Sequence, residues 1–251
     1  MILGPIQLSM IAFAIILGGA FIGVLLRRTL PGHHLDEHGK DVIRLGIGLI
    51  GTVAALSLGL LVASAKSSFD TQSNRVTGLA ADIVLLDELL AQYGPETREA
   101  RDLLRNTIDS TINRIWSSSA APSKGVQLDA SFVANPRLLE LQPQTEPQLQ
   151  VKAMAMRISA DVARARLRLF VDDGVSVPMP FLAVLVFWLT IIFASFSLFS
   201  PLNPTTVVAL TVVALSASCA IYLILDLARP FWGLIEVSSE PLRNALAPLG
   251  P

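Results

Sequence analysis

The stretch from Leu45 to Ala65 is the feature that most limits what this chain can fold into. It contains no charged residue and is bounded by Arg44 and Lys66. A helix of about 20 apolar residues crosses the hydrocarbon core of a bilayer, which is about 30 Å thick. The stretch is therefore predicted to be a transmembrane helix. No Gly or Pro lies between Lys66 and Asp70, so this helix is expected to continue directly into a polar one.

Three further uncharged stretches have the same character, at about residues 6–26, 180–199 and 205–225. The stretch 6–26 is comparable to a cleaved secretory signal only in its position. No basic residue precedes it, and Arg27 and Arg28 follow it where a small-residue cleavage site would be needed. We expect it to be retained as a transmembrane helix.

These stretches predict an all-α polytopic membrane protein with four transmembrane helices in a 2+2 arrangement. Residues 1–66 hold the first two helices, 67–178 a water-exposed helical insert, 179–226 the last two helices, and 227–251 a C-terminal tail. The insert contains 14 acidic and 12 basic residues, whereas the whole chain of 251 residues is 52% hydrophobic with a net charge of −1. This composition is typical of a membrane protein and gives no indication of nucleic-acid binding. The single cysteine, Cys219, lies in the fourth stretch and is expected to serve as a small packing residue.

The insert is predicted to consist of helices with narrow apolar faces, because apolar residues recur at alternating spacings of three and four. The first helix ends at Gly94-Pro95, the second covers about 96–116, and residues 117–147 are expected to form a loop. The faces of the first and last helices either pack on each other as antiparallel partners or pack elsewhere in the insert. The three predicted faces are Phe69, Gln72, Val76, Leu79, Ile83, Leu86, Leu90 and Tyr93; Ala100, Leu104, Ile108, Ile112 and Ile115; and Leu149, Ala153, Met156, Ala160, Ala163, Leu167 and Phe170.

Small residues recur at every fourth position of the second transmembrane stretch. Residues at this spacing share one helix face, and small side chains let another backbone approach closely. The face is predicted to pack against a helix, including one from another subunit, and consists of Gly51, Ala55, Gly59 and Ala63.

No catalytic motif is present, and the chain is not expected to be an enzyme or to need a cofactor. His34 and His38 are four residues apart and have carboxylates nearby, which is a weak pattern for a transition-metal site. A solvated polar connection between two membrane helices explains the same residues more simply. We therefore predict no metal site.

The transmembrane stretches hold no carboxylate or histidine that would form an ion relay, which disfavours secondary transport but not a passive pore. Asp226, at the end of the fourth stretch, is expected to pair with Arg229 on one helix face.

Short motifs in a fixed order resemble those of one family. Lys66-Ser67-Ser68-Phe69-Asp70 resembles the bestrophin step in which the second membrane helix leaves the membrane through a basic residue and an aromatic-Asp pair. Arg229-Pro230-Phe231-Trp232-Gly233 resembles the Pro-Phe motif that follows the last bestrophin membrane helix. Over nearly its whole length, the chain resembles the bacterial bestrophin-like membrane proteins, formerly a domain of unknown function.

This resemblance implies a homopentameric ion channel with a helical insert in the cytoplasm and the second membrane helix around a central pore. Bestrophins narrow the pore with bulky apolar residues, and the positions in that register here are Ile50, Ala54 and Leu58. The implied partners are the bilayer, further copies of the chain and small inorganic ions. No equivalent of the calcium-binding acidic cluster of the animal channels is present.

Positive charge flanks the membrane stretches on both sides. The first connection holds Arg27, Arg28, Lys40 and Arg44, which by the positive-inside rule favours a cytoplasmic location for that connection. More cations flank the stretches on the insert side, namely Lys66, Arg75, Arg164, Arg166, Arg168, Arg229 and Arg243. With the bestrophin orientation, we expect an inner-membrane protein whose insert and termini are cytoplasmic.

The sequence is compatible with two functions. The first is an oligomeric ion channel. The second is a non-conducting membrane scaffold, in which the face with Gly51 and Gly59 serves only helix packing and the insert binds a partner protein.

Overall fold

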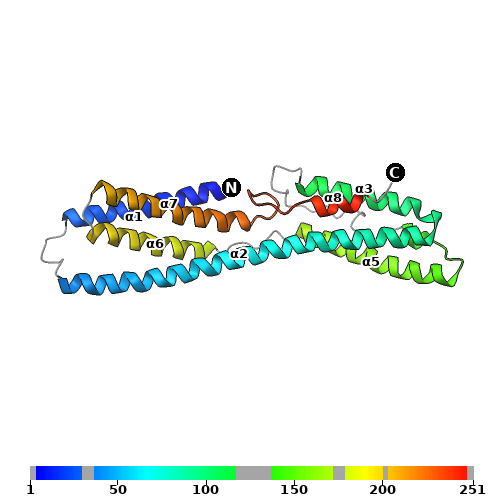
Figure 1. Cartoon of the computed structure of the whole chain (residues 1–251), viewed down its shortest axis with the longest axis horizontal. Coiled ribbons are helices and arrows are strands. Elements are labelled where there is room, and N and C mark those ends of the chain that lie inside the picture. Colours follow the sequence, from blue (N-terminus) through cyan, green and yellow to red (C-terminus); the bar gives the residue numbers. More distant parts are fainter. Residues whose placement is uncertain (1–3, 30–36, 117–136, 172–178, 200–202, 248–251) are drawn as a thin grey trace. The chain divides into compact units, whose positions relative to one another are not determined.

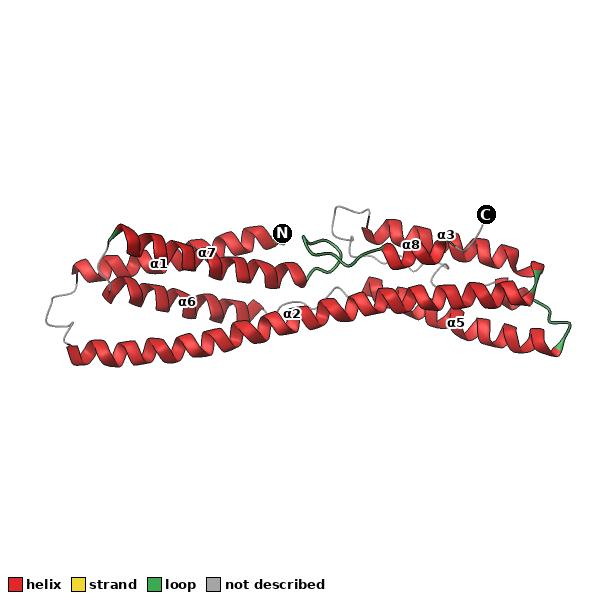
Figure 2. Ribbon diagram, in the orientation of Figure 1, coloured by secondary structure: helices red, strands yellow, loops and turns green. Residues whose placement is uncertain are grey.

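The computed structural model describes residues 4–29, 37–116, 137–171, 179–199 and 203–247, and side chains at 37–40, 170 and 171 are not described. Every regular element in these ranges is a helix (Figure 2). Four of the helices contain stretches that are long and apolar enough to cross a membrane. The all-α prediction is confirmed for the described residues.

The chain divides into two compact units. The apolar unit comprises residues Met1–Ser67 and Ser176–Ala228, and the polar unit comprises Ser68–Val175 and Arg229–Pro251. Each unit is therefore built from two separate parts of the sequence. Helix α2, Glu37–Tyr93, is assigned as one helix of 57 residues and contributes to both.

The apolar unit contains α1 (Pro5–Thr29), the first part of α2, α6 (Met179–Phe199) and α7 (Pro204–Leu227) (Figure 1). Helices α1, α6 and α7 each extend a few residues beyond the predicted apolar stretch at one or both ends. Differences of this size are usual between helix boundaries from different criteria. Helix α1 packs against both α6 and α7. Two clusters of buried apolar side chains fill the space between the helices, one of them around Leu185 and Ile221 and the other around Ile16 and Phe193.

The polar unit contains the second part of α2, the 3₁₀ turn η2 (Pro95–Thr97), α3 (Arg98–Trp116), α4 (Arg137–Glu140), α5 (Glu146–Val171) and α8 (Glu240–Leu246). Helix α2 ends at Tyr93 and is followed by Gly94, whose φ of 140° is a conformation that glycine adopts without strain. The hydroxyl of Thr97 then donates to the carbonyl of Leu90 at 2.6 Å, which satisfies an acceptor at the helix end.

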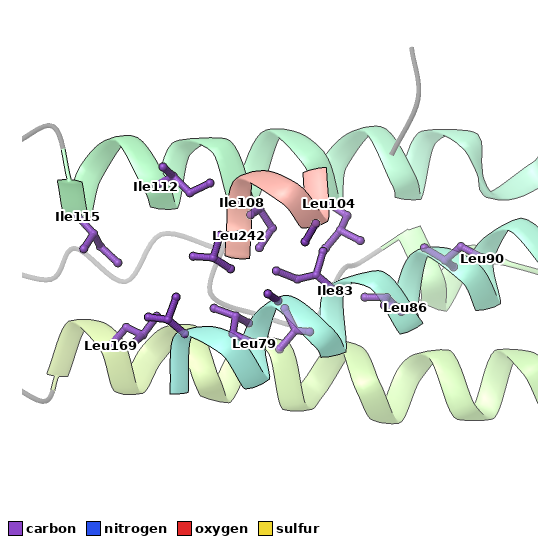
Figure 3. Packing of buried hydrophobic residues seen from close by; sticks show 14 of the residues in the cluster. Leu79, Ile83, Leu86, Leu90, Leu104, Ile108, Ile112, Ile115, Leu169 and Leu242 are labelled. Carbon is purple, nitrogen blue, oxygen red and sulfur yellow. The ribbon is translucent and has the colours of Figure 1, made fainter. Parts of the chain in front are cut away.

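One apolar cluster forms the core of the polar unit. In Figure 3, Leu79 and Ile83 of α2 point toward Ile108 of α3 and Leu242 of α8, and Leu169 of α5 lies at the edge of the cluster. The predicted faces of α2 and α3 are confirmed, since every member from Gln72 to Tyr93 and from Ala100 to Ile115 is buried and only Phe69 is half-buried.

The predicted apolar face of α5 is wrong. Leu149 is 50% exposed and Met156 36% exposed, whereas the buried positions are Ala155, Ser159, Val162, Arg166 and Leu169. A pattern of apolar residues alone misses this face because two of its buried members are polar. The predicted loop at 117–147 also needs correction where it is described: α4 occupies Arg137–Glu140 and α5 begins at Glu146, while residues 117–136 lie outside the described part.

Candidate functional site

The predicted pore register on α2 faces the interior of the apolar unit. Ala54 is only 3% exposed. Ile50 and Leu58 are partly buried and pack on the same cluster, whose other members come from α1, α6 and α7: Ala12, Leu182, Leu185, Ile192, Ile221 and Leu225. Within one chain, these three positions therefore contribute to the packing of the four helices.

The opposite side of α2 is exposed along the apolar stretch. Leu45, Leu49 and Leu56 are 76%, 68% and 66% exposed. They lie about half a turn away from Ala54, because each residue advances the helix by about 100°. One chain thus leaves a surface of large apolar side chains on α2 for lipid, for a pore or for another subunit.

The predicted small-residue face is also mostly exposed in the single chain. Gly51 is half-buried, and Ala55, Gly59 and Ala63 are exposed. A Cβ atom added to Gly51 or Gly59 would meet no atom within 4 Å. No helix of the described chain uses this face for close packing.

A different pair of glycines makes the close contact in this unit. A Cβ atom on Gly19 of α1 would lie 2.6 Å from Cγ2 of Thr190 in α6, and one on Gly23 would overlap the carbonyl oxygen of Ala194. The spacing Gly19-x-x-x-Gly23 is the small-residue motif that lets two membrane helices approach closely. The motif is visible in the sequence, but our sequence analysis did not single it out.

Helices α1 and α7 share a buried hydrogen bond. The hydroxyl of Ser218 donates to the carbonyl of Ser9 at 2.7 Å. At the end of α7, Asp226 is 2% exposed and accepts a hydrogen bond from the hydroxyl of Tyr222 at 3.3 Å. The predicted Asp226–Arg229 pair stays a prediction.

The Ser-Ser-Phe-Asp motif lies within α2. Lys66 is exposed, and Ser68, Phe69 and Asp70 are half-buried. The ring of Phe69 packs against the core cluster of the polar unit. The motif contains no helix break, as its composition predicted.

The Arg-Pro-Phe-Trp-Gly motif begins a closed loop that we call the C-terminal loop, residues 229–237. The amide of Trp232 donates to the carbonyl of Arg229 at 3.2 Å, and the amide of Val237 donates to the carbonyl of Pro230 at 2.7 Å. These two bonds bring the start and the end of the loop together. Arg229 and Gly233 are half-buried.

Two indole groups join the C-terminal loop to the end of α3. The Nε1 of Trp116 donates to the carbonyl of Val237 at 2.8 Å, and the Nε1 of Trp232 donates to the carbonyl of Ile115 at 3.2 Å. Phe231 is 6% exposed and makes an edge-on contact with the ring of Trp116, with centroids 5.4 Å apart. The family motif therefore has a structural role in the polar unit, which short sequence motifs do not reveal.

Two charged contacts stabilise the helices of the polar unit. Arg101 of α3 donates from both Nε and Nη2 to the carboxylate of Asp87 in α2, at 2.5 and 2.9 Å, and this hydrogen-bonded carboxylate raises the pKa of Arg101 above its ordinary value. The Nε of Arg166 in α5 donates to the hydroxyl of Thr111 in α3 at 3.1 Å. Burial, with a smaller contribution from Arg114, lowers the pKa of Arg166 to about 10.

Among the described carboxylates of the polar unit, Asp82 has a pKa that departs from its ordinary value. Partial burial raises the pKa of Asp82 on α2 above its ordinary value, and the negative charge of Asp161 on α5 raises it further. These pKa shifts all belong to residues on helices that pack together in the polar unit.

The weak metal candidates are not placed by the structure. His34 lies outside the described residues, and the side chain of His38 is also not described. Among the residues that are described, no group of three or more His, Cys, Asp or Glu side chains is arranged to hold a metal ion.

The fold and these surfaces define an all-helical membrane protein with a helical polar unit. A family model described as the Bestrophin-like domain matches residues 14–242, and the chain belongs to this family. Comparison with curated proteins and with solved structures gave no match.

Proposed function

We propose that this protein is one subunit of a homo-oligomeric ion channel in which α2 helices surround a central pore. The family match over residues 14–242 carries the proposal, since bestrophins are channels. In the proposed topology, four helices span a bacterial inner membrane in a 2+2 arrangement. The polar unit and both termini are cytoplasmic, and the assembly is pentameric, as the family resemblance implies.

The exposed surface of α2 supports an assembly of several chains. A side of α2 with Leu45, Leu49 and Leu56 is exposed, while the adjacent face with Gly51, Ala55, Gly59 and Ala63 offers room for another backbone. A pore between subunits requires such free surfaces on each chain.

Two registers of α2 are candidates for the pore wall. The family resemblance assigns Ile50, Ala54 and Leu58, whereas the burial of Ala54 favours the opposite side with Leu49 and Leu56. The ring of leucines on that side would form a hydrophobic constriction of the kind that gates by dewetting.

Cysteine accessibility during current recording tests the proposal. In a Cys219→Ala background, Leu49→Cys, Leu56→Cys and Ala54→Cys are reconstituted in planar bilayers with KCl and treated with a charged thiol reagent. We expect the reagent to change the current at Leu49 and Leu56 and to leave the Ala54 variant unchanged. A change only in the Ala54 variant would assign the pore to the register that the resemblance implies.

A non-conducting scaffold is the second candidate function, and the burial of Ala54 in the chain's own core favours it. The scaffold predicts no current from the unmodified protein in any common salt. The particle mass in detergent is an independent measurement, because a monomer contradicts the channel whatever the recordings show. A C-terminal reporter that is active only in the periplasm contradicts the proposed orientation.

A further inference from the structure

The C-terminal loop presents apolar side chains at its tip. Leu234 is 81% exposed and Ile235 39% exposed, although Phe231 and Val237 on either side are only 6% and 3% exposed. Leaving a leucine in water instead of burying it costs about 1.5–3 kcal/mol. Loop tips in water are normally polar, so this tip is suited to an apolar environment.

Hydrogen bonds hold the residues on both sides of the tip. At the end of the loop, the amide of Val237 donates to the carbonyl of Pro230, and the carbonyl of Val237 accepts a hydrogen bond from the indole of Trp116. The indole of Trp232 is bonded to the carbonyl of Ile115. Residues 233–236 lie between these bonded positions, and residues 234–236 are exposed.

The tip follows closely after an apolar helix in the sequence, which indicates that lipid covers it. Helix α7, which is apolar and long enough to cross a membrane, ends at Leu227. Seven peptide units separate Leu227 from Leu234, and even a fully extended chain covers only about 24 Å over that distance. The loop shortens this distance further, because the bond between Trp232 and Arg229 makes a turn. The tip is therefore tethered close to a membrane surface.

We propose that the tip of the C-terminal loop, with Leu234 and Ile235, inserts into the boundary between lipid headgroups and acyl chains. Apolar side chains beside a membrane helix gain free energy at this boundary. The interaction anchors the C-terminal loop to the bilayer surface. It does not depend on ion conduction, so it is separable from the proposed channel function.

Fluorescence quenching from the lipid side tests the proposal. Leu234→Cys in a Cys219→Ala background is labelled with the polarity-sensitive fluorophore NBD and reconstituted in phosphatidylcholine vesicles. A second set of vesicles contains phosphatidylcholine with a doxyl group close to the headgroup. We expect blue-shifted emission and quenching by the doxyl lipid of about twofold, as for a side chain at the interface.

Leu139→Cys is the matched control. Leu139 belongs to α4 of the same polar unit and is 65% exposed. Arg137 of α4 pairs with Glu99 at the start of α3, whereas the C-terminal loop is bonded to Ile115 at the end of that helix. We expect NBD at this site to be quenched by iodide in the buffer and not by the doxyl lipid. Both variants replace exposed leucines, and an unchanged elution profile in detergent confirms that they fold.

Two results would overturn the proposal. Equal quenching of both labelled sites by iodide would place the tip in water. Blue-shifted emission at Leu234 without quenching by the doxyl lipid would mean that protein, such as a second copy of the chain, covers the tip.

Discussion

The two units of the molecule differ in how a pair of helices is brought together. In the apolar unit, α1 and α6 approach so closely that Gly19 and Gly23 have no room for a Cβ atom. In the polar unit, large aliphatic side chains such as Ile83 and Ile108, both 0% exposed, fill the space between α2 and α3. The contact between α1 and α6 depends on the absence of side chains, and the contact between α2 and α3 depends on their volume.

The surrounding solvent explains the difference. Apolar side chains gain little by moving from lipid into a protein, so membrane helices associate through close fit and hydrogen bonds such as that between Ser218 and Ser9. In water, removal of apolar area drives association. The apolar unit should therefore be sensitive to added volume and the polar unit to lost volume.

Loss of volume in the polar unit should give the largest effect. We expect Ile83→Ala to lower the free energy of unfolding by about 4 kcal/mol, because it leaves a cavity in a fully buried cluster. Denaturant unfolding of the detergent-solubilised protein, followed by circular dichroism, measures the change. Val84→Ala is the control, since Val84 is 43% exposed on the same helix, and similar losses for both would contradict the assigned core.

Added volume in the apolar unit should follow. We expect Gly23→Leu to lower the free energy of unfolding by about 3 kcal/mol, because its side chain meets the backbone of α6 at Ala194. Thermal stability in detergent, read from the elution profile after heating, measures the loss. Gly18→Leu is the matched variant because a Cβ atom there meets nothing within 4 Å. If Gly18→Leu were equally harmful, close packing of α1 on α6 would not be the cause.

Charge should matter inside the polar unit and little on its surface. We expect Asp87→Asn to cost about 2 kcal/mol, since it leaves Arg101 without its carboxylate while the Asp87 side chain is only 10% exposed. The same unfolding experiment measures it. Glu140→Gln breaks the exposed pair with Arg137 at 2.8 Å and should give no measurable change. Equal effects would mean that burial does not strengthen the Asp87–Arg101 pair.

The pH dependence of the polar unit gives the smallest effect. The raised pKa of Asp82 means that the folded protein favours the protonated carboxyl. The protonated Asp82 carboxyl therefore contributes to the free energy of unfolding fully below its ordinary pKa of 3.8. This contribution is lost as the pH rises through the raised pKa of the folded protein. Asp82→Asn should therefore stabilise the protein slightly at neutral pH and not at all at pH values below the ordinary pKa. Unfolding curves at both pH values measure this, and a gain that is independent of pH would exclude the ionisation of Asp82 as its cause.

The helices and two core faces were predictable because they depend on local patterns. Uncharged stretches predicted the four apolar segments, and the repeat from Gln72 to Tyr93 predicted the buried side of α2. The face of α5 was not predictable from apolar residues, because Arg166 is buried through its bond to Thr111, 55 residues earlier. A polar residue can lie in a core when its partner comes from another helix, and single-sequence periodicity does not contain that partner.

The candidate site was less accessible to sequence analysis. The register of Ile50, Ala54 and Leu58 came from resemblance, and the inward position of Ala54 depends on how side chains of α1, α6 and α7 pack against one side of α2. The C-terminal loop also depends on long-range contacts, since the indole of Trp116 reaches Val237, 121 residues later. Such contacts follow from tertiary packing and leave no local pattern.

The composition of the polar core has a consequence for biosynthesis. Phe231, Val237, Leu242 and Ala245 belong to the same cluster as Ile83 and Ile108, yet α6 and α7 are synthesised before them. On the ribosome, the polar unit therefore lacks part of its core until both apolar helices have been made. A chain that stops before Phe231 leaves this core open to water, so packing of the polar core requires that translation has passed Ala245.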